Sequence, residues 1–108
     1  MKYILLTFFI GLSFKVSAQI NYKYQNNLSF SYSETIENYK ILDSLYVNAK
    51  LVEIGKSDIG RPIHLFVVSE AGDFSPESLD SKGKAILLIN NGIHPGEPCG
   101  IDASLKFA

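Results

Sequence analysis

Apolar and polar positions alternate with a helical period between residues 31 and 49. Ser31 and Glu34 have the spacing of a capping box, in which the serine hydroxyl accepts a backbone N–H and the glutamate accepts the N–H of the cap residue. Apolar side chains then recur every three or four positions, and polar side chains occupy the remaining face. The apolar positions are Ile36, Tyr39, Ile41, Leu42, Leu45 and Tyr46. We expect an amphipathic helix that begins at Ser31 and ends near Ala49.

Two short aliphatic segments follow, residues 50–54 and 62–69. The connection between them contains two glycines and an aspartate, which is typical of a chain reversal and predicts a β-hairpin. Both faces of the second segment are largely apolar, so we expect this strand to lie well inside a sheet. We interpret His64 in this strand as a structural histidine and Arg61 as a residue that holds the turn.

The next part of the chain is a polar connection, which is followed by the most apolar segment outside residues 1–18. Residues 71–84 collect Gly, Asp, Ser and Pro without a period and predict an exposed loop. Ala85–Ile89 shows no alternation, which predicts a central strand covered on both faces. Residues 103–108 are compatible with a helix and carry no stop signal, so we expect the natural protein to continue. This order predicts an α/β fold with a mixed β-sheet flanked by helices, incomplete in this chain.

The first eighteen residues have the pattern of an export signal. Met1 and Lys2 precede an apolar run from Tyr3 to Phe14, and Val16-Ser17-Ala18 provides modest side chains for cleavage before Gln19. The run is too short for an ordinary membrane span. An N-terminal strand or an uncleaved anchor is the alternative. We expect a signal peptide over residues 1–18 and a secreted or periplasmic protein without stable membrane insertion after cleavage.

The composition of the chain argues against some classes of binding partner. The 108 residues, 46% of them hydrophobic, fit one globular domain. Without Lys2 and Lys15 the chain keeps eight basic against 11 acidic residues, a formal charge near −3 that offers no attraction for nucleic acid or an anionic membrane. Cys99 is the single cysteine and forms no internal disulfide, so we expect burial or a metal to stabilise the domain.

The candidate metal-binding residues lie directly after the predicted central strand, where α/β proteins commonly place functional loops. His94 and Glu97 form a His-x-x-Glu pair, and glycines and prolines restrict the loop around them. Imidazole nitrogen and carboxylate oxygen both suit Zn²⁺, and a catalytic zinc commonly takes three protein ligands and one water. By itself this motif is weak, because most such pairs are ordinary surface residues.

Two nearby residues allow more than one interpretation. Cys99 lies near the start of the last helix, where a helix N-terminus can lower a thiol pKa, but without a separate base we favour a packed small hydrophobe over a nucleophile. Asp102 is either a partner that orients a ligand histidine or an ordinary acid in the first helical turn.

Two motifs in order resemble the zinc carboxypeptidase (metallocarboxypeptidase) family. The first is Ile54-Gly55-Lys56-Ser57 followed by Gly60-Arg61-Pro62-Ile63, and the second, after an apolar segment, is Asn91-Gly92-Ile93-His94-Pro95-Gly96-Glu97. In that family a helix precedes the hairpin, and the next strand delivers two ligands of a single catalytic zinc. The resemblance, which extends from Ser31 to Ala108, implies that residues 19–108 are the N-terminal part of the catalytic domain.

The resemblance also implies a function. His94 and Glu97 would be the first two Zn²⁺ ligands, whereas the third ligand, a histidine, and the general-base glutamate come later in the family's chain. The implied reaction is zinc-dependent hydrolysis of amide bonds in peptides or cell-wall peptides, with this stretch inactive alone. Gly96 stands where many digestive members have Arg, so their standard carbonyl contact and C-terminal specificity are not expected. The alternatives are an aspartoacylase-like zinc deacylase and a non-catalytic peptide-binding domain of the same fold.

Overall fold

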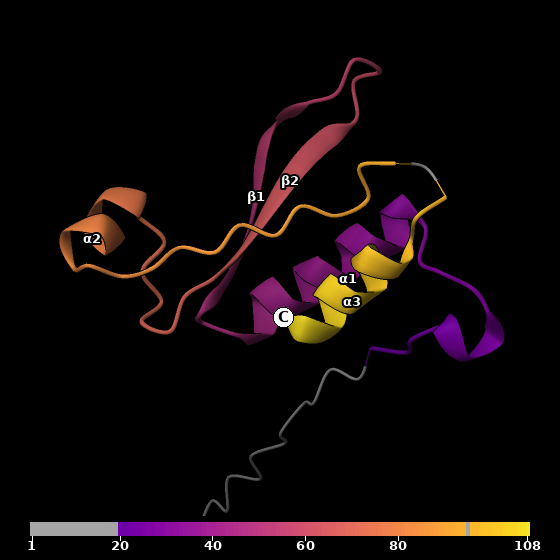
Figure 1. The fold of residues 1–108 in the computed structure, drawn as a ribbon, viewed down its shortest axis with the longest axis horizontal. Coiled ribbons are helices and arrows are strands. Elements are labelled where there is room, and N and C mark those ends of the chain that lie inside the picture. Colours follow the sequence, from indigo (N-terminus) through magenta and orange to yellow (C-terminus); the bar gives the residue numbers. More distant parts are fainter. Residues whose placement is uncertain (1–19, 95) are drawn as a thin grey trace, which may run out of the picture.

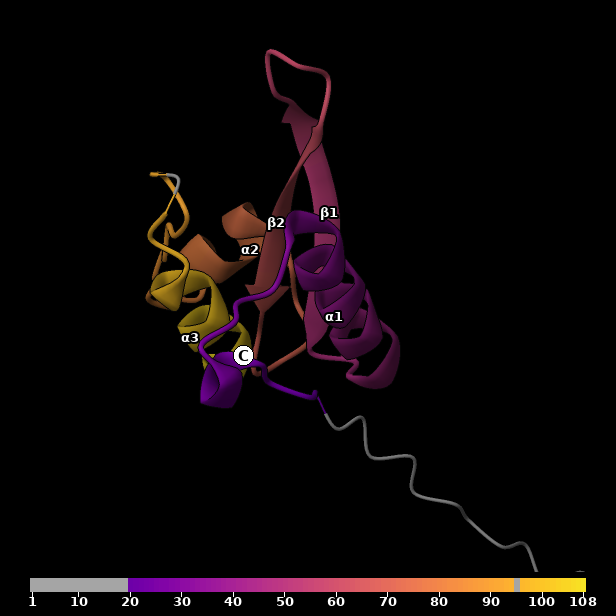
Figure 2. The same ribbon diagram turned by 90° about the vertical axis from the view of Figure 1, so that its right-hand side faces the viewer.

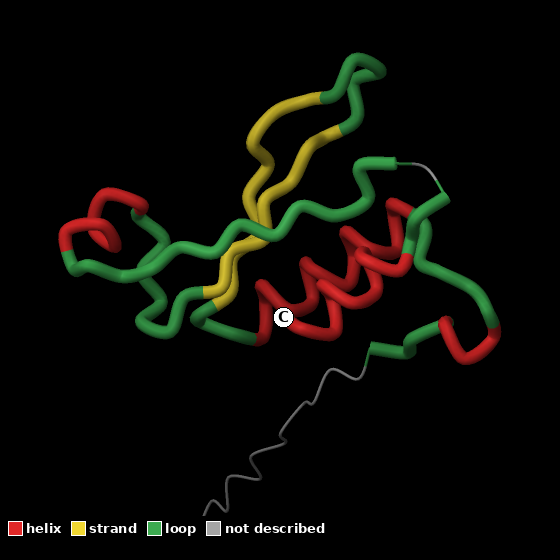
Figure 3. The backbone as a smooth tube through the Cα atoms, viewed as in Figure 1, coloured by secondary structure: helices red, strands yellow, loops and turns green. Residues whose placement is uncertain are grey.

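The computed structural model describes residues 20–94 and 96–108 of the chain. Within these ranges the chain forms a short 3-10 helix, one β-hairpin and three α-helices (Figure 1, Figure 3): η1 (Tyr24–Asn26), α1 (Tyr32–Leu45), β1 (Ala49–Lys56), β2 (Pro62–Val68), α2 (Pro76–Ser81) and α3 (Cys99–Phe107). The described part is therefore a small α/β arrangement. The predicted signal peptide over residues 1–18 and its cleavage site before Gln19 lie outside the described residues. None of the helices in the described ranges is long and apolar enough to cross a membrane.

Helix α1 begins at the capping box that the sequence predicts. The Ser31 backbone N–H donates to Glu34 Oε2 at 2.9 Å, and the Glu34 N–H donates to Ser31 Oγ at 3.4 Å. Lys23 also donates to the Glu34 carboxylate, and this bond, with the bonds from Ser31, lowers the pKa of Glu34 to about 2. The helix ends at Leu45 and not near Ala49, because Tyr46 adopts extended backbone angles and Ala49 already belongs to β1.

The predicted hairpin is confirmed. Strands β1 and β2 are antiparallel, and the pairing runs from Ala49 opposite Val68 to Lys56 opposite Pro62. An irregularity between Glu53 and Gly55 leaves Ile54 as an extra residue in β1. In the described residues the sheet contains these two strands and no parallel pair, so the mixed sheet expected from the sequence is not seen there.

One face of the hairpin packs against α1 and the other is open. Tyr39 of α1 lies against Phe66 of β2, and the Tyr32 hydroxyl donates to the Pro62 carbonyl at 2.7 Å. On the opposite face Ile63 and Leu65 are 45% and 39% exposed. The expectation that the second strand lies well inside a sheet is therefore wrong for the described part, because the structure places a covering element against one face and leaves the other to solvent.

The core lies where α1, α3 and the N-terminal segment meet. Phe30, Leu42 and Leu105 are buried together, and they are surrounded by half-buried Ile20, Tyr22, Tyr39 and Phe66. Helix α3 runs beside α1 in both ribbon views (Figure 1, Figure 2). This packing determines the position of α3, and the loop before α3 carries the candidate site.

The connection between β2 and the apolar segment contains a helix that the sequence analysis missed. Helix α2 begins after Ser75, whose Oγ accepts the Ser78 N–H at 3.2 Å. Asp73 accepts bonds from the Ser78 hydroxyl at 2.7 Å and from Lys82 at 2.6 Å, and these contacts lower the pKa of Asp73 to about 2, with Lys82 as the main cause. The signals were present as a serine cap followed by Pro76 at the first helical position, where proline is favoured.

The expectation of a central strand at Ala85–Ile89 is also wrong. This segment is irregular, makes no backbone hydrogen bond to any described residue, and exposes its aliphatic side chains. Leu87 and Leu88 are 78% and 74% exposed. An unbroken apolar run shows that a segment favours burial, but strand formation depends on a neighbouring backbone and covering side chains that the run itself cannot specify.

Candidate metal centre

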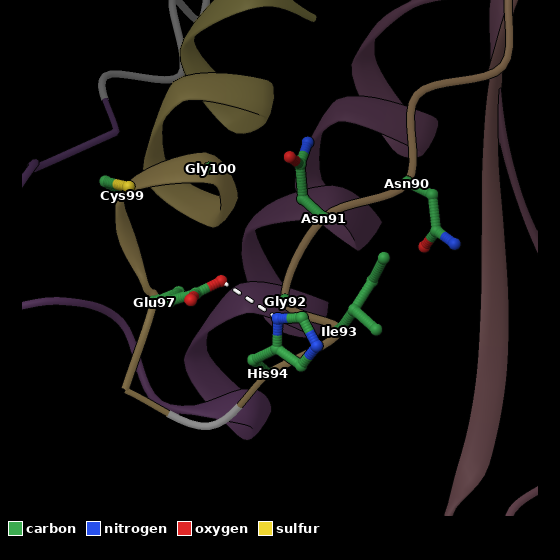
Figure 4. A pocket seen from close by; sticks show the side chains of 8 residues that line it. All are labelled: Asn90, Asn91, Gly92, Ile93, His94, Glu97, Cys99 and Gly100. Atoms are coloured by element: carbon green, nitrogen blue, oxygen red, sulfur yellow. Dashed lines mark hydrogen bonds and ion pairs between the residues drawn. The ribbon is translucent and has the colours of Figure 1, made fainter.

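The loop between the irregular apolar segment and α3 forms an open pocket of about 320 Å³ (Figure 4). It is built from one continuous stretch of chain: Asn90, Asn91, Gly92, Ile93, His94, Glu97, Cys99 and Gly100 line it. The loop leaves the extended segment, reverses, and enters the helix through Pro98, which is the N-cap residue of α3. The two sequence-predicted ligands therefore line a single depression.

His94 and Glu97 face each other across the tip of this loop. The distance between His94 Nδ1 and Glu97 Oε2 is 3.2 Å, and both side chains are about two-thirds exposed (Figure 4). The Glu97 backbone N–H donates to the His94 carbonyl at 3.4 Å, which closes a tight turn. Gly96 within this turn has φ of +90°, a conformation that glycine adopts without steric cost.

This geometry fits two ligands of a zinc ion. Nitrogen and oxygen donors lie about 2.0–2.2 Å from zinc, so two of them at a tetrahedral angle are separated by about 3.3 Å or slightly more. The observed separation of 3.2 Å between Nδ1 and Oε2 is close to that value. Without a metal the pair is an exposed hydrogen bond or ion pair, which contributes little to stability.

The first half of the loop is held against α3. Asn91 Nδ2 donates to the Ser104 hydroxyl, which lies one turn beyond the start of the helix. An ideal Cβ built on Gly100 would lie 2.5 Å from Asn91 Oδ1, so the absence of a side chain at Gly100 allows this approach. Gly92 has φ of +69°, and a Cβ there would lie 3.0 Å from the Ile101 side chain.

No family model, curated protein or solved structure matches the chain. The resemblance to zinc carboxypeptidases therefore rests on the two sequence motifs alone. Among residues 20–94 and 96–108 no three His, Cys, Asp or Glu side chains are grouped closely enough to hold a metal ion. The donor types and the spacing of His94 and Glu97 fit a zinc ion, and these two side chains are the candidate ligands in the described part of the chain.

The structure places the other candidate residues away from this pair or beside it without contact. Cys99 is an exposed free thiol in the pocket wall at the first residue of α3. It is not the packed small hydrophobe that we favoured. Asp102 lies in the first turn of α3, is 8% exposed and does not line the pocket; its Oδ1 is buried without a hydrogen-bond partner. It makes no hydrogen bond to His94, so the structure favours the first-turn acid over the orienting partner.

The hairpin residues also stay outside the pocket. His64 lies on β2 with its ring 6.5 Å from that of Tyr32, and its Nδ1 is buried without a hydrogen-bond partner. The Arg61 backbone N–H donates to Ser57 Oγ at 3.1 Å, and its guanidinium lies over the Tyr32 ring at 5.7 Å. Neither residue lines the pocket.

Sequence reasoning missed the contact of Asn91 with Gly100 and Ser104. The glycine at position 100, inside a helix, is the one available signal, because a glycine there commonly has a packing reason. The partner of that approach is nine residues earlier in the chain and cannot be read from a local pattern.

Proposed function

We propose that the protein is a zinc-dependent hydrolase of peptide bonds, of the metallocarboxypeptidase type, in which His94 and Glu97 are two of the zinc ligands. The observation that carries this proposal is the 3.2 Å separation of His94 Nδ1 and Glu97 Oε2 at the open tip of a constrained loop. The hairpin motif before it supports the same family over the aspartoacylase-like deacylases. The carboxypeptidase-like fold with a mixed sheet belongs to this proposal, as does export to the periplasm or the exterior.

Each part of the loop has a role in the proposed chemistry. A zinc ion bound here supplies a Lewis acid for the scissile carbonyl and a water of lowered pKa. His94 and Glu97 would hold the ion, and their side chains already lie close together without it. Asn90 and Ile93 line the same pocket and would lie beside a bound peptide. The third ligand and the general base are those that the family resemblance implies from residues further along the chain.

Exposure of the pair agrees with a site that meets large substrates. Both ligands are about two-thirds exposed, so a peptide chain reaches the pocket without opening of a covering element in the described structure. The negative formal charge of the mature chain disfavours polyanionic substrates. Peptides and cell-wall peptides, the substrate class that the family resemblance implies, are compatible with both features.

Metal content and hydrolysis of the full-length protein test the proposal. We expect one zinc per chain, hydrolysis of peptides, and loss of activity with a chelator. The His94→Ala and Glu97→Ala variants should lose both bound zinc and activity, because each leaves the ion under-coordinated. His64→Ala and Glu37→Ala are matched controls outside the pocket and should keep both.

The outcomes separate the alternatives. Stoichiometric zinc and normal turnover in either ligand variant would remove that residue from the site. Zinc binding with no hydrolysis of peptides or of N-acyl amino acids would instead identify a non-catalytic binding domain, and cleavage of N-acyl amino acids alone would identify a deacylase.

A further inference from the structure

We infer that Asn91, Gly100 and Ser104 form a positioning device that keeps His94 and Glu97 converged, and this inference rests on the proposed function for its role in metal binding. Asn91 precedes His94 by three residues, and the helix that receives its side chain begins two residues after Glu97. The Asn91 contact therefore closes the loop at its base, while the ligand pair occupies its tip (Figure 4).

The base of the loop is closed by contacts of two kinds. Asn91 Nδ2 donates to Ser104 Oγ, so the loop is joined to the second turn of α3 by a side-chain hydrogen bond. Asn91 also occupies the space over Gly100, where a Cβ would lie 2.5 Å from Oδ1 and 2.9 Å from Cγ. Gly92, in a left-handed conformation, then directs the chain past Ile101 toward His94.

Few other contacts in the described residues hold the His94 and Glu97 side chains in place. In the described residues the recorded partner of each ligand side chain is the other ligand, at 3.2 Å. Residues 85–93 make no backbone hydrogen bond to a described residue, so the loop approaches His94 without support from a sheet. The contact of Asn91 with α3 is thus the described side-chain restraint on the chain that leads into His94. Groups that orient metal ligands typically change metal affinity 10–100-fold when removed.

The test uses the full chain with Zn²⁺ as the probe, measured by competition with a chromophoric chelator. We expect Asn91→Ala and Ser104→Ala each to weaken zinc binding roughly tenfold, at the lower end of the range for such groups. Ser104→Thr keeps the hydroxyl and should retain the affinity. Ser44→Ala removes a hydroxyl that bonds only its own helix, at the Ile41 carbonyl, and is the matched control.

Helix stability separates positioning from a structural role. Alanine is a better helix former than serine or glycine, so Ser104→Ala and Gly100→Ala should not reduce the helical circular dichroism of α3. Gly100→Ala should nevertheless weaken zinc binding, because its Cβ displaces Asn91. The double variant Asn91→Ala/Gly100→Ala should bind zinc no more weakly than Asn91→Ala alone, since both changes remove the same contact.

A measurement without metal decides the inference independently of the proposed function. In the zinc-free wild-type protein, a nuclear Overhauser cross-peak should join the His94 ring protons to the Glu97 side chain, and it should weaken in Asn91→Ala and Ser104→Ala. If these variants keep both the cross-peak and the wild-type zinc affinity, the positioning role is wrong. If the wild-type chain binds no zinc while the cross-peak still depends on Asn91, the proposed function falls and the positioning role stands.

Discussion

Tyr39 of α1 and Phe66 of β2 lie with their ring centroids 4.6 Å apart and their planes inclined by 37°. Both rings border the buried cluster of Phe30, Leu42 and Leu105. This contact joins the N-terminal helix to the hairpin, and burial of Tyr39 raises the pKa of its phenol. The pair therefore connects the two elements that the sequence specifies most clearly.

Loss of the Phe66 ring should destabilise the protein. Phe66 is half-buried, so Phe66→Ala is expected to lower the free energy of unfolding by about 2 kcal/mol, less than the 3–5 kcal/mol typical of a fully buried aromatic residue. Chemical denaturation measures this change. Val47→Ala, at a side chain 90% exposed, should change the unfolding free energy by less than about 0.5 kcal/mol. Equal effects of the two substitutions would show that α1 does not pack on the hairpin in solution.

The Glu34 carboxylate should make stability depend on pH in acid. Its pKa is about 2 in the folded chain, below the ordinary value of 4.5, because Lys23 and Ser31 donate hydrogen bonds to it. A lowered folded-state pKa stabilises the protein above the unfolded pKa, and that contribution is lost as pH falls toward 2. Glu34→Gln should flatten the dependence of unfolding free energy on pH between about 5 and 2.

Lys23→Met is the companion test of the Glu34 prediction. Because Lys23 is the largest cause of the lowered pKa, this variant should reduce the same acid dependence. Asp73, whose pKa is also about 2, should preserve part of the slope in both variants. An unchanged acid slope in both would contradict the role of the Lys23–Glu34 contact.

The hairpin turn should require glycine at Gly60. This residue has φ of +76°, where an L side chain is strained, so Gly60→Ala should cost about 1 kcal/mol. Gly55→Ala is the matched control, because Gly55 has no positive φ and no atom lies within 4 Å of its ideal Cβ. Thermal denaturation of the two variants compares them, and a Gly60→Ala protein as stable as Gly55→Ala would exclude the left-handed turn.

Export can be examined at the protein terminus. If residues 1–18 are a signal peptide, the protein expressed with them should leave the cytoplasm and begin at Gln19, because signal peptidase cuts after small side chains such as those of Val16-Ser17-Ala18. Intact mass spectrometry of the exported protein measures this. Replacing Ala18 with a bulky residue, Ala18→Phe, should block cleavage, whereas Asn21→Phe beyond the site should leave it unchanged. An exported wild-type protein that still begins at Met1 would contradict the signal.

Features whose hydrogen bonds join residues a few positions apart could be predicted from the sequence. The Ser31–Glu34 capping box and the turn around Gly60 depend on donors and acceptors three or four positions apart, so a local pattern specifies them, and this turn aligns the two strands of the hairpin. The His-x-x-Glu spacing likewise places two metal-capable groups within reach of one another in a tight turn.

Features that depend on partners far away in the sequence could not be predicted, because they follow from the packing of the whole fold. The apolar run Ala85–Ile89 indicates a preference for burial, but a strand also requires a neighbouring backbone, and the described residues offer it none. Asp102 is buried and Cys99 is exposed because α3 packs one of its faces on α1, and no local pattern states which face that is. The contact of Asn91 with Ser104 joins residues 13 positions apart. This contact forms because the packing of α3 brings that helix to the base of the loop. The position of a packed helix depends on the whole core and not on a local sequence pattern.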